Sequence, residues 1–414
     1  MNQGSNPLPE GVETLGRIGL IAGLVGLALL GAGYATDRDQ LFRSYLTGYM
    51  WMLGLAAGAL GVMLLHHVTR GAWGVVIRRI LEAAASPLTL GFAAVAFLPI
   101  ALGTHSLYEW THAEVVAGDA ILSYKKPWLN EPAFLGRSAA YLVLWIVLAA
   151  VFARLSARQD ETGDRRIALS MQRWGAFGVV AFILSMTFAA FDWMMSLTPH
   201  WFSTIYGLYV IIGQAVAAMA LVALAGLLLG EGPSPALPLQ PRHLHDHGKL
   251  LFAFVCVWAY FGYSQFIIIW SGNLPEETTF YTSRLNGAWK ATTVVLVLLH
   301  YALPFALLLS RNRKRSASFA NASILATSRC GTRLPFHASR NLLIRLRSLA
   351  IEEPSIRKRN GTSSRKSLST YPMIAGNPLA RYSRTFNGLA SDRPFLSSAS
   401  VPTAASQPAR TEEY

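Results

Sequence analysis

Eight runs of apolar residues constrain this chain more than any other feature of its sequence. A helix needs about 20 apolar residues to cross a hydrocarbon core about 30 Å thick. Within lipid, backbone polar groups must pair inside the segment, which favours helices. The sequence therefore predicts an all-α polytopic membrane protein whose spans cover about Leu15 to Tyr34, Tyr45 to Leu65, Pro87 to Gly103, Ser138 to Leu155, Met171 to Leu197, Ile205 to Leu229, Lys249 to Trp270 and Gly287 to Leu309.

Composition agrees with this class, since 52% of the residues are hydrophobic and only 14% are charged. Residues 1–14 are expected to form a cytoplasmic N-terminal segment and residues 15–309 the transmembrane domain. The first run is read as a retained span because no basic segment with a small-residue cleavage site accompanies it. The two cysteines, Cys256 and Cys330, are too few for a disulfide framework, a four-cysteine iron-sulfur site or a CxxCH haem attachment.

Four segments modify the simple picture of eight straight spans. Glycines 16, 19, 23 and 26 give the first span a small-residue face that favours close helix approach. Trp73 to Ala84 has apolar residues at helical spacing around two arginines, which predicts an interfacial helix. Pro99 predicts a kink in the third span. Thr104 to Gly136 is long for a connector, which indicates a functional or disordered segment.

The distribution of basic residues predicts the orientation. Lys and Arg near span ends are retained in the cytoplasm. The N-terminus and the loops after spans two, four, six and eight hold fifteen of them, whereas the loops after spans one, three, five and seven hold six. Both termini are therefore predicted to be cytoplasmic. It follows that Asp192 and the loop after the third span face outward.

A carboxylate inside the end of an apolar helix is the most informative polar residue. Asp192 belongs to the stretch FDWMMSLTPHWFSTIYGLY, residues 191–209, which connects the fifth and sixth spans. A charge at the centre of a membrane helix costs roughly 2.5 to 3.5 kcal/mol on insertion scales, so it is seldom left without a partner or a task. Rings of the kind that are enriched at the level of the lipid headgroups lie near Asp192 in the sequence. They are Trp193, His200, Trp201 and Tyr206.

This stretch and a second one, HDHGKLLFAFVCVWAYFGYSQFIIIWSGNLPEET, resemble the smaller polysulfide-reductase-type (NrfD-like) integral membrane subunit of bacterial alternative complex III. The resemblance covers most of Leu15 to Arg311. It implies two four-helix bundles in the bacterial inner membrane, within a complex that oxidises quinol at the periplasmic side and passes electrons to cytochrome c. It also implies three kinds of partner: a larger sister NrfD-like membrane subunit, which usually holds the quinol site, an iron-sulfur subunit and haem c subunits.

The resemblance implies that the chain is one subunit of an oxidoreductase complex and not an enzyme by itself. Quinol would be the substrate of the complex, and this chain would bind no cofactor. A proton path is one hypothesis for its polar residues, because intramembrane ionisable groups commonly mark relays and pair with one another. The outer end of this proton path would be formed by Asp192 with Lys290 or His105, near Glu109. His300 would act as a relay station on the inner side. The alternative is a structural ion pair that stabilises a bundle contact.

Other polar groups have competing interpretations. The seventh span carries a polar stripe that comprises Tyr260, Tyr263, Ser264 and Gln265. This stripe would bind a quinone carbonyl or extend the proton path. Hydrogen bonding between packed helices is the favoured interpretation. His243, His245 and His247 resemble a metal site, but a solvated loop is favoured, with Asp246 capping the seventh helix. A bis-histidine haem between His66 or His67 and His300 has no other support. We therefore predict no metal site in this chain.

Two other function classes stay open. A purely structural anchor for peripheral redox subunits needs no chemistry from this chain. A secondary transporter would show paired interrupted spans, and Pro99 and Pro304 show no matching repeat around them. Nucleic acid is not an expected partner, whereas the lipid bilayer is.

Residues 310–414 differ in composition from the rest. Seventeen serines occur in the 99 residues from Ser316, against sixteen in the first 315 residues. The same 99 residues hold fourteen Lys or Arg against five acids, and no run long enough to span. We expect a disordered basic tail. Because Ser- and Arg-rich sequence arises when GC-rich DNA is read out of frame, we hypothesise a frameshift near Arg315. Translation of the other two frames should then reveal two apolar segments.

Overall fold

The computed structural model describes residues 10–230 and 241–311. The chain divides into two units, Met1–Phe336 and His337–Tyr414, and all described residues belong to the first. Most of the predicted N-terminal segment, residues 231–240 between the sixth and seventh spans, and almost all of the basic tail lie outside the described residues. The predictions of a disordered tail and of a frameshift are therefore not addressed by the structure.

The described residues form helices, 3-10 turns and one π-helical turn, with no strand among them. Eight helical segments are long and apolar enough to cross a membrane, which confirms the predicted all-α polytopic class. They are α1 (Glu10–Thr36), α2 (Arg38–Thr69), α3 to α5 (Arg78–Ala84, Pro87–Ala96, Leu98–Leu102), α9 (Glu131–Thr162), α10 (Arg165–Trp193), α11 (Tyr206–Gly230), α12 (Pro241–Gly272), and α14 with η4 and α15 (Gly287–Leu296, Val297–Ala302, Leu303–Leu309).

Helix ends follow local capping chemistry. The Asp37 carboxylate accepts the Gln40 N-H at 3.0 Å before α2, and Asn130 Oδ1 accepts the Ala133 N-H at 3.0 Å before α9. Such side chains satisfy N-H groups that have no partner in the first helical turn. Gly163 closes α9 with a φ of 63°, a left-handed conformation that glycine adopts without steric cost.

Prolines interrupt two spans. Between α4 and α5 the helix breaks at Phe97, two residues before Pro99, because proline clashes with the preceding turn and provides no N-H. The Ala96 carbonyl freed by this break accepts the Tyr45 hydroxyl at 2.7 Å. The predicted kink is thus confirmed. In the eighth span, the π-helical turn η4 ends two residues before Pro304.

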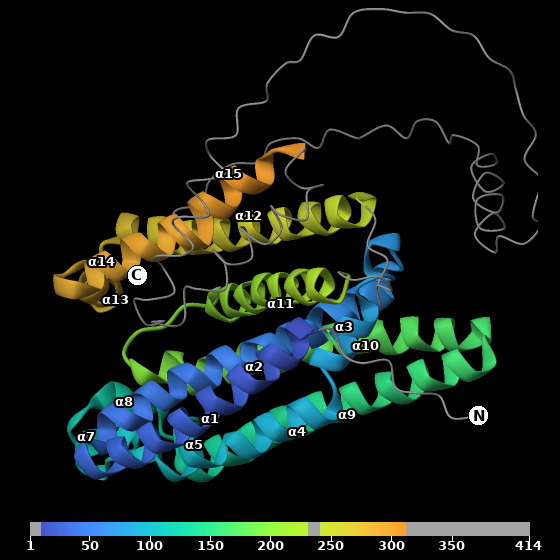
Figure 1. Ribbon diagram of the computed structural model, residues 1–414. Helices are drawn as coiled ribbons and strands as arrows, with labels where there is room; N and C mark the ends of the chain where they lie inside the picture. The colour runs from blue at the N-terminus through green and yellow to red at the C-terminus, as the bar shows by residue number, and fades with distance from the viewer. Residues whose placement is uncertain (1–9, 231–240, 312–414) are drawn as a thin grey trace, which may run out of the picture. The chain divides into compact units, whose positions relative to one another are not determined.

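Four of the spans form a bundle. Helix α2 packs against α10 and α4, and α9 packs against the same two helices. Figure 1 shows these four helices running alongside one another. Helix α11 packs against α2 and α10, α12 against α11, and α15 against α12. One of the two expected four-helix bundles is therefore present. The remaining spans do not close a second bundle among the described residues, since α1 packs against α2 instead.

Close helix approach occurs on α2 rather than on α1. A Cβ built at Gly58 would lie 2.2 Å from the Gln214 carbonyl oxygen on α11, and one at Gly54 would lie 3.4 Å from Gln214 Cγ. Small residues four positions apart let two backbones approach in this way. The described chain places nothing within 4 Å of a Cβ at glycines 16, 19, 23 and 26, so the small-residue face of the first span makes no close contact with the described part of this chain.

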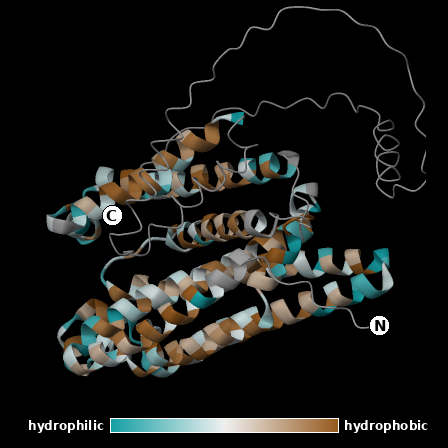
Figure 2. Ribbon diagram, viewed as in Figure 1, coloured by the Kyte–Doolittle hydropathy of each residue, from teal (hydrophilic) through white to brown (hydrophobic). Residues whose placement is uncertain are grey.

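The outer surface has the character of a membrane protein. Figure 2 shows hydrophobic residues along the long helices and hydrophilic residues mainly near their ends. At one end of the bundle, the segment after α5 is folded into short helices: α6 (Thr104–Leu107), η2 (Glu109–Thr111), α7 (Ala113–Gly118) and α8 (Ala120–Lys125). Tyr108 and Trp110 of this segment are buried, with 1% and 4% exposure. The expected long loop is therefore an ordered cap.

The predicted interfacial helix is only partly present. The stretch from Trp73 to Ala84 comprises η1 (Ala72–Gly74), a turn and α3, and α3 continues into the third span. Arg78 does not reach outward, because its guanidinium donates to Gln159 and Ser156 on α9, each at 2.9 Å. These contacts tie α3 to the bundle.

Candidate functional site

A buried ion pair lies at the end of α10. Asp192 is in the last turn of this helix and its side chain has 0% exposure. Arg137 of α9 donates to both carboxylate oxygens, from Nε to Oδ2 at 2.9 Å and from Nη2 to Oδ1 at 2.8 Å. A two-pronged pair of this kind fixes orientation as well as distance. The pair therefore fastens the fourth span to the fifth.

Two further donors complete the surroundings of the carboxylate. Trp128 Nε1 donates to Oδ1 at 3.0 Å, and the Tyr141 hydroxyl donates to Oδ2 at 3.0 Å. The Arg137 guanidinium also lies 4.0 Å from the Trp128 ring centroid, within the range of a cation-π contact. Asp192 thus accepts four hydrogen bonds and is fully satisfied as an anion. We call these four residues the Asp192 cluster.

Local structure brings the cluster together. Arg137 and Tyr141 are four residues apart on α9, so they share one helix face. Trp128 lies just before the Asn130 cap that starts α9, and Asp192 comes from the far end of α10. Because α9 and α10 are antiparallel neighbours with a short connection, the start of α9 lies beside the end of α10.

An aromatic layer surrounds the cluster. Trp193, next to Asp192, is fully buried and packs against the rings of Tyr49, Phe97, Tyr141 and Trp145. Its Nε1 donates to Ser138 Oγ at 2.8 Å, and its carbonyl accepts the Tyr108 hydroxyl at 3.1 Å. Burial raises the pKa of Tyr108 above its usual value, so this phenol stays a donor at neutral pH. The layer contributes to the complete burial of the Asp192 side chain.

The predicted partners of Asp192 are wrong in identity. The sequence suggested Lys290 on the eighth span or His105 after the third span as the partner. The structure places the partners on the fourth span and just before it. His105 is exposed on α6 beside Thr111 and His112, Glu109 is exposed on η2, and Lys290 is exposed on α14. The rule that buried charges pair was correct, but it does not select the partner helix.

The loop after α10 is held by contacts with the cap. His200 Nε2 and the Asp119 carboxylate form a hydrogen-bonded pair, and Lys125 Nζ donates to the Pro199 carbonyl at 2.6 Å. Hydrogen bonds from the Leu122 N-H and then from His200 lower the pKa of Asp119, whereas burial lowers the pKa of Lys125. The 191–209 stretch is thus anchored to the α7 and α8 segment.

A second polar cluster lies at the opposite end of the bundle. Glu82 bridges Arg78 at 2.6 Å and Ser156 at 2.8 Å, and Arg79 pairs with Asp160. His66 and His67, at the end of α2, are 7% and 8% exposed. Their Nδ1 and Nε2 atoms, respectively, are buried without a hydrogen-bond partner in the described part of the chain. No sequence argument had linked these histidines to Arg78 and Glu82.

The predicted polar stripe on α12 does not face one site. Tyr260 and Tyr263 are each 65% exposed, whereas Gln265 is buried and accepts the Ser203 hydroxyl at 3.2 Å. Ser264 is half-buried. Gln265 therefore connects α12 to the segment before α11, while the two tyrosines point to the protein surface.

The structure also places the histidines that were considered as metal or haem ligands. His243, His245 and His247 lie in the first turns of α12, and not in a loop, because the helix starts at Pro241. Asp246 is therefore inside the helix and does not cap it. His247 Nε2 lies 2.9 Å from the Met219 carbonyl oxygen. The His300 ring packs on Trp258. Among the described residues, no group of three His, Cys, Asp or Glu side chains is placed to hold a metal ion.

The fold and this site define a class, an eight-span helical membrane protein with a buried ion pair at one end of a four-helix bundle. Comparisons with known proteins do not narrow the class, because no protein-family model and no curated protein matches this chain.

Proposed function

We propose that this chain is an integral membrane subunit of a quinol-oxidising respiratory complex of the quinol:cytochrome c oxidoreductase type, and that it acts mainly as a scaffold. The observation that carries the proposal is the Asp192 cluster. Asp192 lies at the start of the stretch on which the resemblance rests, and its carboxylate is fully buried and paired with Arg137 through two hydrogen bonds. A sister membrane subunit, an iron-sulfur subunit and haem c subunits in the bacterial inner membrane would complete the complex.

The geometry favours a scaffold because the carboxylate is fully buried and its hydrogen bonds come from protein groups. A proton carrier needs a neighbouring group or water with which to exchange protons, but the groups that donate to Asp192 are a guanidinium, an indole and a phenol. Breaking such a buried pair costs about 3 to 5 kcal/mol. The cluster therefore suits a rigid end of the bundle on which outer subunits dock.

A proton path is the second candidate, and a different observation favours it. Buried polar atoms without hydrogen-bond partners in the described chain occur along α2 and its contact with α11: Tyr49 Oη, Gln214 Oε1, His66 Nδ1 and His67 Nε2. Buried polar groups of this kind usually bind internal water. From Tyr49 to His66 the helix rises about 26 Å, close to the thickness of the hydrocarbon core.

The two candidates are separated by variants in the assembled complex. Asp192→Asn tests the ion pair, Lys290→Met tests the originally predicted relay partner, and His67→Gln tests the second candidate. Asp39→Asn, an exposed carboxylate on α2, is the matched control. The scaffold predicts that Asp192→Asn lowers the amount of assembled complex while protons released per electron stay unchanged. The proton path predicts full assembly with a changed proton stoichiometry for His67→Gln.

A further inference from the structure

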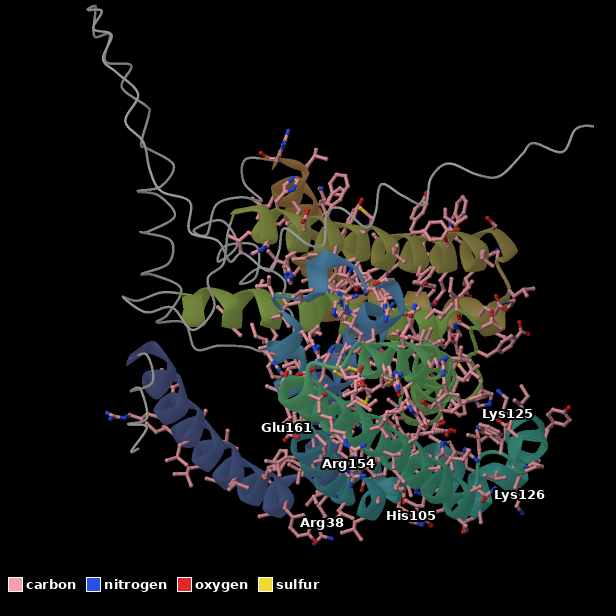
Figure 3. All side chains as sticks on the ribbon, turned by 90° about the vertical axis from the view of Figure 1, so that its right-hand side faces the viewer. Arg38, His105, Lys125, Lys126, Arg154 and Glu161 are labelled. Atoms are coloured by element: carbon pink, nitrogen blue, oxygen red, sulfur yellow. The ribbon has the colours of Figure 1, made fainter. Side chains whose placement is uncertain are left out.

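A pocket of about 510 Å³ lies where α1, α2, α5 and α6 meet. Its walls are largely apolar, including Leu30, Leu41, Phe42 and Leu102, and two basic side chains, Arg38 and His105, also line it. Figure 3 labels both basic residues, which lie along the same edge of the molecule in that view. The volume falls in the range of about 300 to 1,000 Å³ that is typical of small-molecule sites.

The pocket is placed at a membrane surface by the helices that form it. The first candidate span ends at Thr36, the second starts at Arg38, and the third ends at Leu102. Arg38 and His105 are therefore at the level of lipid headgroups. Leu30 lies six residues before the end of α1 at Thr36, which corresponds to about 9 Å along this helix and reaches into the hydrocarbon. A ligand that fills the pocket would be polar at one end and apolar at the other.

The charge at the polar end is positive. The Arg38 guanidinium lies 4.4 Å from the centroid of the Tyr34 ring, which also lines the pocket. The neighbouring Asp37 does not line the pocket, and its carboxylate accepts the Gln40 N-H at 3.0 Å. His105 lies on the opposite wall with its Nδ1 3.3 Å from the Thr111 hydroxyl. A guanidinium of this kind recognises phosphate oxygens.

We propose that this pocket binds an anionic phospholipid, whose phosphate contacts Arg38 and His105 and whose acyl chain lies against Leu30, Leu41 and Phe42. The packing of α1 gives an independent reason. None of the first span's most apolar window is buried, and α1 packs mainly against α2. A lipid in the pocket would fill the space between α1 and α5. A neutral quinone would fill the apolar part but would leave the Arg38 charge without a counterion.

The test uses the full chain, with any subunits that copurify, in nanodiscs of phosphatidylcholine containing a minor fraction of phosphatidylglycerol. Native mass spectrometry then counts the lipids that stay bound. Arg38→Gln should lower the ratio of bound phosphatidylglycerol to phosphatidylcholine about fivefold, as expected for one basic residue at a lipid surface. Arg43→Gln removes the same charge from the same helix outside the pocket and should leave the ratio unchanged.

Two further arms fix the nature of the ligand. Ser106→Trp, which places a bulky ring in the pocket lining, should remove the retained phosphatidylglycerol, whereas millimolar inorganic phosphate should not displace it. Equal ratios in the two arginine variants would overturn the proposal. So would displacement of the lipid by phosphate, which would indicate a free-anion site, or preferential retention of a short-chain quinone.

Discussion

At the scale of single residues, Asp192 depends on Arg137 because a buried carboxylate has no access to water. The pair itself need not add much net stability, since two charges had to be desolvated to form it. Replacing only one of the two residues is costly, because the charge of the other residue would then be buried and unpaired. The asymmetry makes Arg137 the residue whose replacement should be most informative.

We predict that Arg137→Gln destabilises the protein by about 3 to 5 kcal/mol. Thermal unfolding in detergent, followed by tryptophan fluorescence, measures the effect. Arg154→Gln, on an exposed position of the same helix, should change stability by less than about 0.5 kcal/mol. The double variant Arg137→Gln with Asp192→Asn should recover part of the loss. Equal stabilities for the Arg137 and Arg154 variants would show that the pair is dispensable.

The Asp119 and His200 pair predicts a pH effect in the cap. The pKa of Asp119 is lowered from its ordinary value of 3.8 in the folded state, so the charged form stabilises the local structure at higher pH. That contribution is lost as the pH falls below about 3.8. The Asp119 carboxylate accepts hydrogen bonds from the Ile121 and Leu122 N-H groups, so the protection of these amides against hydrogen exchange, measured relative to their intrinsic rates, should fall in that range. The Asp119→Asn variant should lose this pH dependence. An unaltered pH dependence in that variant would contradict the role of the Asp119 carboxylate.

At the scale of elements, the glycines of α2 set how near α11 can come. Gly58→Ala should destabilise the protein by about 1 to 3 kcal/mol, because its Cβ would meet a backbone oxygen at 2.2 Å, which cannot move as a side chain would. Gly48→Ala on the same helix has nothing within 4 Å and is the matched control, expected to be neutral or stabilising. The melting temperatures of the two variants measure this difference. Equal melting temperatures for Gly58→Ala and Gly48→Ala would contradict the close contact between α2 and α11.

The elements themselves could be predicted from the sequence because length and hydropathy determine a membrane span. The break before Pro99 also follows from local chemistry. By contrast, the partner of Asp192 comes from a residue 55 positions away, and no periodicity identifies which neighbouring helix supplies it. The second polar cluster was missed for the same reason, since Arg78 had been read as an interfacial charge. The contact glycines were predicted on α1, whereas those of α2 were not singled out.

At the scale of the whole molecule, the bundle has two polar ends, with the Asp192 cluster at one and the Arg78 and Glu82 cluster at the other. The distribution of basic residues predicts which end faces outward. A reporter fused after Thr198 should report periplasm and one fused after Gly163 cytoplasm. Paired alkaline phosphatase and fluorescent protein fusions at both sites measure this. A cytoplasmic signal after Thr198 would reverse the assigned orientation.

The claim that this chain belongs to a quinol-oxidising complex is tested most directly by purifying the tagged full chain from its native membranes in mild detergent. The preparation should oxidise quinol and reduce cytochrome c, and it should show the absorbance of c-type haem. Asp192→Asn should lower the yield of active complex, while Asp39→Asn should not. A chain that purifies in its folded state without haem and without quinol oxidation would contradict the account.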